Sequence, residues 1–166
     1  DPSNPCGKVF TREELGIIAA YAEKYDTFVI VDEVYSQIIY KPYTYTYFSE
    51  LPHMHDRTIC VGSLSKTYSI TGWRVGYILG PEAVIDEIKK VHTFFTISAP
   101  SPLQEAAVTG LRFGGDYYDG LVKTYTEKRD ILMKGLDDLG LKHNIPQGAF
   151  YLLVDISEFG YEKDTE

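Results

Sequence analysis

Three short runs of apolar and β-branched residues constrain what this chain can fold into. They occupy residues 27–31, 58–62 and 75–79. Unbroken apolar runs of this length suit strands that are buried on both faces of a parallel sheet. Because helical patterns alternate with the runs, the sequence predicts an α/β fold with a mainly parallel sheet.

The helical patterns have recognisable starts and stops. Thr11 and Glu14 form a capping-box pattern ahead of a helix predicted over about residues 12–25. Pro81 suits the first residue of a second helix and Pro102 the start of a third, while Asp116 opens a long helix with a stop at Gly140. After it, residues 148–155 are interpreted as a strand that enters a second unit.

Charge and cysteine usage argue against several classes of partner. The net charge of the 166 residues is −8, whereas nucleic acids and anionic membranes are bound by clustered lysine and arginine. No apolar run approaches the roughly 20 residues that span a bilayer, and no signal peptide opens the chain. Cys6 and Cys60 lack metal-ligand spacing and favour a reducing compartment. We therefore expect a cytoplasmic protein that binds neither nucleic acid nor membrane.

Reactive side chains follow two of the predicted strands, at the ends where open α/β sheets bind ligands. They comprise an acid, a phenol, two hydroxyls, an amine and, before the third strand, a guanidinium: Asp32, Tyr35, Ser63, Ser65, Lys66 and Arg74. Pyridoxal phosphate (PLP) needs these types of group. An amine joins its aldehyde, a carboxylate keeps its pyridine nitrogen protonated, and a phenol can hydrogen-bond its ring oxygen. Hydroxyls and a fork-shaped guanidinium suit its phosphate.

Each of these residues has an ordinary structural explanation when it is taken alone. Asp32 is typical of a helix N-terminus or a solvated turn, and Lys66 of a protein surface. Arg74 alone indicates a structural ion pair, and Tyr35 a packing residue. Asn4, between two prolines, is typical of a turn. The joint occurrence carries the argument, because all of these explanations would have to hold at once.

Three other motifs suggest different functions, and each is set aside for a stated reason. Residues 28–33 fit the Walker B strand of an ATPase, but the chain has no phosphate-binding loop of the matching type. Ser63 and Lys66 fit the Ser-x-x-Lys motif of penicillin-binding enzymes, whose other two motifs are missing. His53 and His55 form a His-x-His pair in a loop, a pattern that is more often solvated than metal-binding. We expect no metal site.

Four motifs, in order and spacing, resemble the class I and II aminotransferases of PLP fold type I, the aspartate aminotransferase-like enzymes. They are Asp-Pro-Ser-Asn-Pro-Cys-Gly from residue 1, Val-Asp-Glu-Val-Tyr from residue 31, Ser-Leu-Ser-Lys-Thr from residue 63 and Thr-Gly-Trp-Arg-Val-Gly from residue 71. The similarity continues through Gly-Ala-Phe-Tyr at residues 148–151. The resemblance departs mildly at Cys6, where the family pattern has threonine.

The resemblance implies a role for each matching position. Lys66 would be the Schiff-base lysine and then the base at the substrate's Cα, Asp32 the partner of the pyridine nitrogen, and Tyr35 a donor to the ring oxygen O3′. Asn4 would contact O3′ beside the substrate carboxylate. The phosphate would be held by Ser63, Ser65 and Arg74. The implied reaction is amino-group transfer between an amino acid and a 2-oxo acid.

The resemblance also implies that the chain is a middle segment of a longer, homodimeric enzyme. Residues 1–134 would be part of a three-layer α/β/α PLP-binding domain with a mainly parallel sheet, including a linking helix. Residues 135–166 would begin a small α/β domain. The family's glycine-rich phosphate loop and its carboxylate-binding arginine are not matched here; Arg112 and Arg129 do not fit that motif.

Two other functional interpretations stay open from the sequence. Carbon–sulfur lyases and decarboxylases of the same fold share these anchoring residues. From a different class, the chain by itself could be a non-catalytic α/β fragment or binding module.

Overall fold

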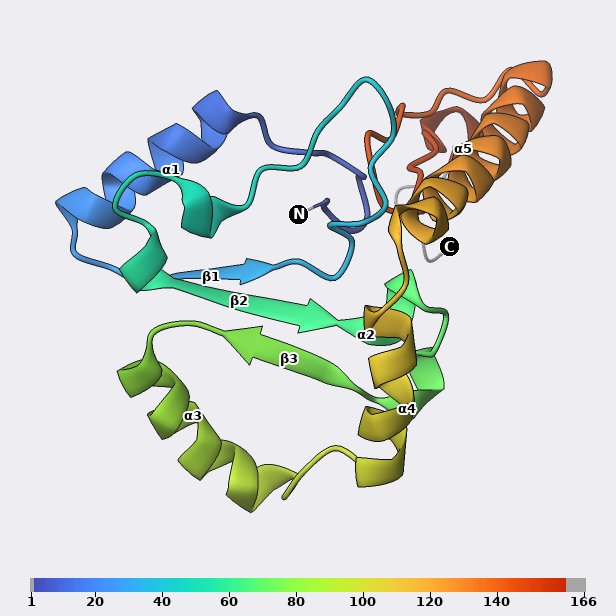
Figure 1. Ribbon diagram of the computed structural model, residues 1–166. Coiled ribbons are helices and arrows are strands. Elements are labelled where there is room, and N and C mark those ends of the chain that lie inside the picture. The colour runs from blue at the N-terminus through green and yellow to red at the C-terminus, as the bar shows by residue number, and fades with distance from the viewer. Residues whose placement is uncertain (1, 161–166) are drawn as a thin grey trace.

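The computed structural model describes residues 2–160, in which helices surround a small sheet (Figure 1). In chain order the helices and strands are α1 Arg12–Lys24, β1 Val29–Asp32, β2 Thr58–Ser63, α2 Leu64–Thr67, β3 Gly76–Leu79, α3 Glu82–Phe95, α4 Ser101–Leu111 and α5 Gly115–Asp138. Short 3-10 turns occur at Phe48–Glu50, His55–Arg57, Thr71–Trp73 and Ser157–Phe159. The chain is therefore a mixed α/β structure.

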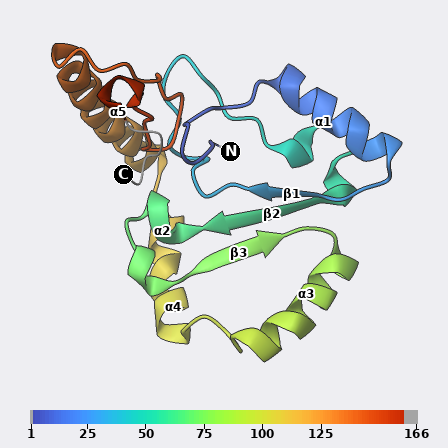
Figure 2. The same cartoon turned by 180° about the vertical axis from the view of Figure 1, so that it is seen from behind.

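The sheet in the described residues is mixed. Its strand order is β1-β2-β3, with β1 parallel to β2 and β2 antiparallel to β3. Both figures show β1 and β2 pointing toward α2 and β3 returning from it (Figures 1 and 2). The predicted third strand is thus present but antiparallel. The reason lies in residues 64–75, which turn at one edge of the sheet instead of crossing over it, as a parallel connection must.

The expectation that all three strands are buried on both faces is wrong for this chain. Only β2 is largely buried, whereas β1 alternates between partly buried and exposed residues and β3 is exposed at all four positions. Ile30 and Leu79 retain 71% and 59% of their surface. Strands β1 and β3 therefore carry apolar side chains that residues 2–160 leave exposed.

Helix α1 confirms the predicted capping box and covers β1. The Thr11 side chain accepts a hydrogen bond from the Glu14 N–H, and the Glu14 carboxylate accepts one from the Thr11 N–H. The buried face of the helix forms one core with the loop between β1 and β2, against Val29 and Val31. Its buried members are Leu15, Ala19, Ala22, Phe48, Leu51 and Met54.

The later helices lie close to their predicted bounds. Pro81 is the N-cap of α3 instead of its first residue, and α4 begins at Ser101, one residue before Pro102. Helix α5 begins at Gly115 and ends at Asp138, shortly before Gly140, which has a φ of +71°. A positive φ at this place suits glycine and stops the helix as predicted.

The predicted strand at residues 148–155 is wrong. This segment forms only isolated bridges, Ile39 with Gly148 and His143 with Val154, and does not join the sheet. Ala149 has a φ of +59°, which interrupts the extended conformation. The backbone of residues 147–149 bonds instead to loop residues 7, 38 and 40.

Two further cores fix the surroundings of the sheet edge near α2. One unites Tyr35, Ile38, Tyr40 and Ala149, with Tyr125 and Tyr151 packed against it. The other places Leu64 and Val75 against Ala107 of α4. Segments far apart in the sequence thus meet beside α2. None of the helices within residues 2–160 is long and apolar enough to cross a membrane.

Candidate active site

The strand register brings most of the predicted site residues to one edge of the sheet. Asp32 is the last residue of β1 and lies opposite Val61, and Ser63 is the last residue of β2 and lies opposite Gly76. Lys66 follows in α2, while Arg74 stands two residues before Gly76. Because β1 and β2 are parallel, their carboxyl ends meet at this edge, and the antiparallel β3 begins there. This arrangement matches the place where open α/β sheets bind ligands.

The carboxylate of Asp32 is fixed by the turn that follows β1. Its Oδ1 accepts a hydrogen bond of 3.0 Å from the Val34 N–H. The Glu33 N–H donates to the Val61 carbonyl at 2.8 Å, so the turn stays attached to β2. The Asp32 residue remains exposed. The carboxylate is therefore held at the strand end, at an exposed position.

The ammonium of Lys66 lies over an aromatic ring. Ser63 caps α2 by accepting a 3.1 Å hydrogen bond from the Ser65 N–H, which sets the direction of the short helix. Lys66 Nζ lies 5.6 Å from the centroid of the Phe150 ring. It makes no ion pair with any residue between 2 and 160. The Lys66 side chain is thus placed by α2 and by the Phe150 ring.

Ser63 and Ser65 lie at the start of α2, and Arg74 lies near the end of the loop that joins α2 to β3. Ser65 is buried, and its carbonyl accepts hydrogen bonds from the Ile70 N–H at 3.1 Å and from Thr71 Oγ1 at 3.3 Å. Arg74 has a left-handed backbone with a φ of +55°, and its Nη1 donates to the Thr71 carbonyl at 3.1 Å. Arg74 is exposed. Hydroxyls and a guanidinium therefore stand at the same edge as Lys66.

Tyr35 sits in an aromatic cluster that we define as Tyr35, Tyr125, Phe150 and Tyr151. Its hydroxyl lies 2.6 Å from the Tyr151 hydroxyl. Its ring meets Phe150 edge-on at 5.2 Å, and Phe150 stacks on Tyr125 at 5.6 Å. Burial, followed by the Tyr151 hydrogen bond, raises the pKa of Tyr35 above its usual range. Tyr35 is therefore protonated near neutral pH and can donate a hydrogen bond.

Asn4 lies in a turn whose backbone is bonded to the segment that precedes Phe150 and Tyr151. It is an exposed residue in the turn closed by the 2.7 Å bond from the Gly7 N–H to the Ser3 carbonyl. The Gly7 carbonyl in turn accepts from the N–H groups of Gln147 and Gly148 at 2.8 and 3.0 Å. Within residues 2–160, no hydrogen bond joins the Asn4 side chain to the other predicted site residues.

Sequence reasoning missed the contributions of Tyr125, Phe150 and Tyr151 to this site. The Gly-Ala-Phe-Tyr motif at residues 148–151 was the available signal, but its interpretation as a strand gave the two rings no place. Tyr125 lies within the long helix predicted from Asp116, whose pattern does not distinguish it from a packing residue. Their contact with Tyr35 spans up to 116 residues and leaves no trace in the local pattern.

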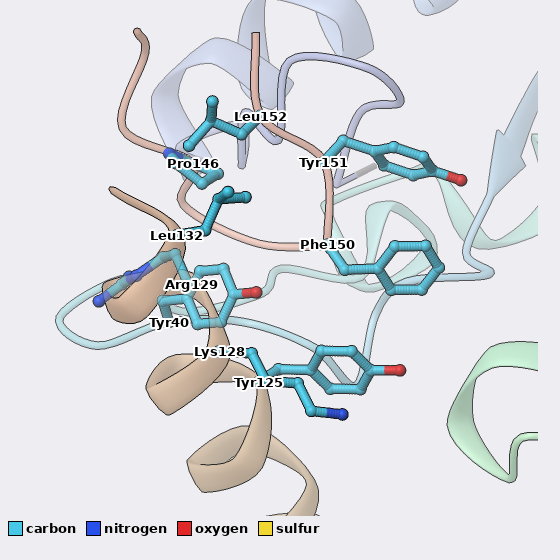
Figure 3. A pocket seen from close by; sticks show the side chains of 9 residues that line it. All are labelled: Tyr40, Tyr125, Lys128, Arg129, Leu132, Pro146, Phe150, Tyr151 and Leu152. Carbon is cyan, nitrogen blue, oxygen red and sulfur yellow. The ribbon is translucent and has the colours of Figure 1, made fainter. Parts of the chain in front are cut away.

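A cavity of about 260 Å³ adjoins the aromatic cluster between α5 and residues 146–152 (Figure 3). Tyr125 and Phe150 face each other at its rim, and Arg129 lies over the Tyr40 ring at 4.4 Å. Neither Asp32, Lys66 nor Arg74 lines it. Arg74 borders a separate hollow between β3 and α3. Of the residues at the sheet edge, Arg74 therefore borders a cavity, whereas Asp32 and Lys66 line neither of these two.

No cluster of metal-ligating side chains occurs in the part of the chain that the structure describes, residues 2–160. His53 and His55 are exposed.

Comparison with known proteins identifies close similarities. The sequence profile described as aminotransferase class I and II matches residues 1–164. A bifunctional aspartate aminotransferase and glutamate/aspartate-prephenate aminotransferase of Petunia hybrida is 42% identical over 98% of this chain. Human kynurenine–oxoglutarate transaminase 1 is 36% identical over 95% of it. The chain spans 35% and 39% of the lengths of these two proteins.

Solved structures show the same relationship in three dimensions. The N-succinyldiaminopimelate aminotransferase of Mycobacterium tuberculosis superimposes with a TM-score of 0.95 at 28% identity. The match covers 99% of this chain and 43% of that protein.

Proposed function

Because this chain belongs to the class I and II aminotransferase family, we propose that the protein containing it transfers an amino group from an amino acid to a 2-oxo acid, with Lys66 as its Schiff-base lysine. The observation that carries this proposal is the meeting of Asp32, Ser63, Lys66 and Arg74 at one edge of the sheet. Since the chain spans well under half the length of its relatives, the activity is proposed for the whole protein.

The residues at this edge fit PLP, which the family uses. When bound, PLP supplies an aldehyde for the lysine amine and a pyridine ring that withdraws electrons from the substrate's Cα. The Lys66 amine, the Asp32 carboxylate at the strand end, the two serine hydroxyls and the Arg74 guanidinium are the kinds of group that such a molecule needs. In this proposal the phosphate is bound by Ser63, Ser65 and Arg74.

The remaining residues hold or move protons. The Asp32 carboxylate, which the Val34 N–H keeps in place, retains a proton on the pyridine nitrogen. Lys66 would take the proton from the substrate's Cα and deliver it to C4′ of the cofactor. Tyr35 donates a hydrogen bond toward O3′, for which its raised pKa suits it. Asn4 contacts O3′ and the substrate carboxylate.

Several features of the whole protein belong to the same proposal. A three-layer domain with a mainly parallel sheet would continue the small mixed sheet seen here. The division into residues 1–134 and 135–166, the homodimer and the cytoplasmic location also remain predictions. Helix α5 extends to Asp138, so that boundary falls within its last turn. The two relatives act on different amino acids according to their names, and we propose no single donor.

Reduction of the loaded protein tests the proposal. The complete gene product is incubated with PLP, reduced with borohydride, and its intact mass and peptides are measured. We expect one added cofactor on the peptide that contains Lys66, no addition in Lys66→Ala, and transamination that is lower by roughly 10³-fold or more in that variant. Lys123→Ala, which removes an exposed lysine of α5, is the control and should load normally. An unmodified complete protein would contradict the assignment.

A further inference from the structure

We propose that Tyr151 is a positioning residue for Tyr35, whose hydroxyl it holds toward the cofactor side of the sheet edge. This inference rests on the proposed function, because it assigns the purpose of Tyr35 to a contact with bound PLP. It adds a residue that lies outside the strand-end motifs, on the segment after α5.

The contact between the two side chains is short and geometrically defined. The hydroxyl oxygens are 2.6 Å apart, and the rings meet edge-on at 5.6 Å with an angle of 87°. Phe150 meets the same Tyr35 ring edge-on at 5.2 Å. With its ring held by two neighbours and 8% of its surface exposed, Tyr35 has little freedom to turn its hydroxyl elsewhere.

The backbone that carries Tyr151 is tied to the backbone that carries Tyr35. The Ala149 N–H donates to the Ile38 carbonyl at 2.9 Å, and the Ile38 N–H donates to the Tyr35 carbonyl at 2.9 Å. The Tyr40 N–H donates to the Gln147 carbonyl at 2.9 Å, and the Tyr40 hydroxyl donates to the Ala149 carbonyl at 2.5 Å. Both tyrosines therefore extend from one hydrogen-bonded clamp, which preserves their separation.

The chemistry of a phenol explains what this contact accomplishes. A tyrosine hydroxyl has one proton to donate and lone pairs with which to accept. When Tyr151 donates to Tyr35, the proton of Tyr35 is directed away from Tyr151 and is available to O3′. Burial, the largest cause, raises the pKa of Tyr35 and keeps its hydroxyl protonated. Tyr35 consequently remains a donor, and Tyr151 sets its direction.

The test uses the complete protein loaded with PLP. The readout is the pH midpoint of the visible absorbance of the bound cofactor. A donor at O3′ stabilises the negative oxygen, so loss of the donor raises this midpoint. We expect Tyr35→Phe to raise it, and Tyr151→Phe to raise it by about half a pH unit, the size of one net hydroxyl hydrogen bond. In the double variant, Tyr151→Phe should add nothing to Tyr35→Phe.

The control is Tyr47→Phe, because Tyr47 also combines a hydroxyl hydrogen bond, 3.2 Å to Gln37, with an edge-on contact to another tyrosine at 4.9 Å. It should leave the midpoint unchanged. If Tyr35→Phe shifts the midpoint and Tyr151→Phe does not, the inference is overturned while the proposed function stands. An equal effect of Tyr151→Phe with and without the Tyr35 hydroxyl overturns it too. Failure of the unaltered protein to load at Lys66 removes both proposals before any tyrosine is changed.

Discussion

Glu33 follows Asp32 in the chain and precedes Tyr35 by two residues, but its carboxyl is buried in the protein. Its residue retains 6% of its surface, and its Oε1 is buried without a hydrogen-bond partner in residues 2–160. Burial raises the pKa of the Glu33 carboxyl, although Cys60 and Tyr45 beside it act in the opposite direction. Burial and the Glu33 carboxyl together raise the pKa of Cys60 to about 11. Adjacent acids of this turn thus have different surroundings, since Asp32 is exposed.

The raised pKa of Glu33 makes a prediction about stability. The folded state binds its proton more tightly than the unfolded state, so the contribution of Glu33 to stability is greatest below the ordinary value of 4.5. It declines as the pH rises from there through the raised value. Glu33→Gln should remove this decline. Urea unfolding of the complete protein at several pH values between 4 and 8 measures it.

Glu50→Gln is the control, because Glu50 is exposed. It should retain the pH dependence of the unaltered protein. Identical slopes for Glu33→Gln and the unaltered protein would show that the Glu33 carboxyl is solvated in the native state.

Among the elements, α1 depends on its first turn. The capping box joins Thr11 and Glu14, and the same Glu14 carboxylate pairs with Lys8 at 2.6 Å. Removal of the Thr11 hydroxyl leaves the Glu14 N–H without its partner. Thr11→Ala should lower the free energy of unfolding by ~1 kcal/mol, as measured by denaturant titration of the complete protein.

Thr109→Ala provides the comparison, because Thr109 is an exposed residue inside α4. Alanine has the higher helix propensity, so this change should be neutral or slightly stabilising. Equal destabilisation by both substitutions would mean that the cap contributes nothing specific.

Elements with local signals could be predicted, and those defined by distant contacts could not. The capping box of α1 and the glycine after α5 depend on neighbouring residues, so sequence patterns located both helices. The antiparallel direction of β3 depends on how residues 64–75 turn, which apolar periodicity does not encode. Residues 148–155 were apolar enough for a strand, but the backbone partners of Gly148 and Ala149 lie more than 100 residues earlier.

In the candidate site, too, some residues could be predicted from local patterns and one could not. Asp32, Lys66 and Arg74 could be grouped because each stands at the end or beginning of a recognisable strand. Tyr151 belongs to the same group through a hydroxyl contact with Tyr35, which no strand pattern records.

The molecule as a whole leaves much apolar surface uncovered. At the end of α3 and just beyond it, Phe94, Phe95 and Ile97 retain 92%, 83% and 80% of their surface. Ile30 on β1 is also exposed, and β1 and β3 are the outer strands of the described sheet. Large exposed apolar patches and open strand edges favour association with other chains.

We therefore expect the 166-residue polypeptide, when produced alone, to aggregate and to lack a cooperative thermal transition. Size-exclusion chromatography and circular dichroism during heating measure the two properties. Phe94→Glu combined with Phe95→Glu should reduce aggregation without restoring cooperativity, because the sheet edges stay open. A monodisperse sample of the unaltered polypeptide with a cooperative transition would refute this expectation.

The clamp between residues 38–40 and 147–149 has a consequence for synthesis on the ribosome. Tyr35 and Tyr151 are separated by 116 residues, which take roughly 6–23 s to translate at about 5–20 residues per second. Through most of that interval β1 and α2 have already been synthesised, but the segment that packs on Tyr35 has not. Contacts of such long sequence separation also form slowly. The aromatic cluster is thus completed only after residue 151 has been made, and until then Tyr35 lacks the neighbours that cover it.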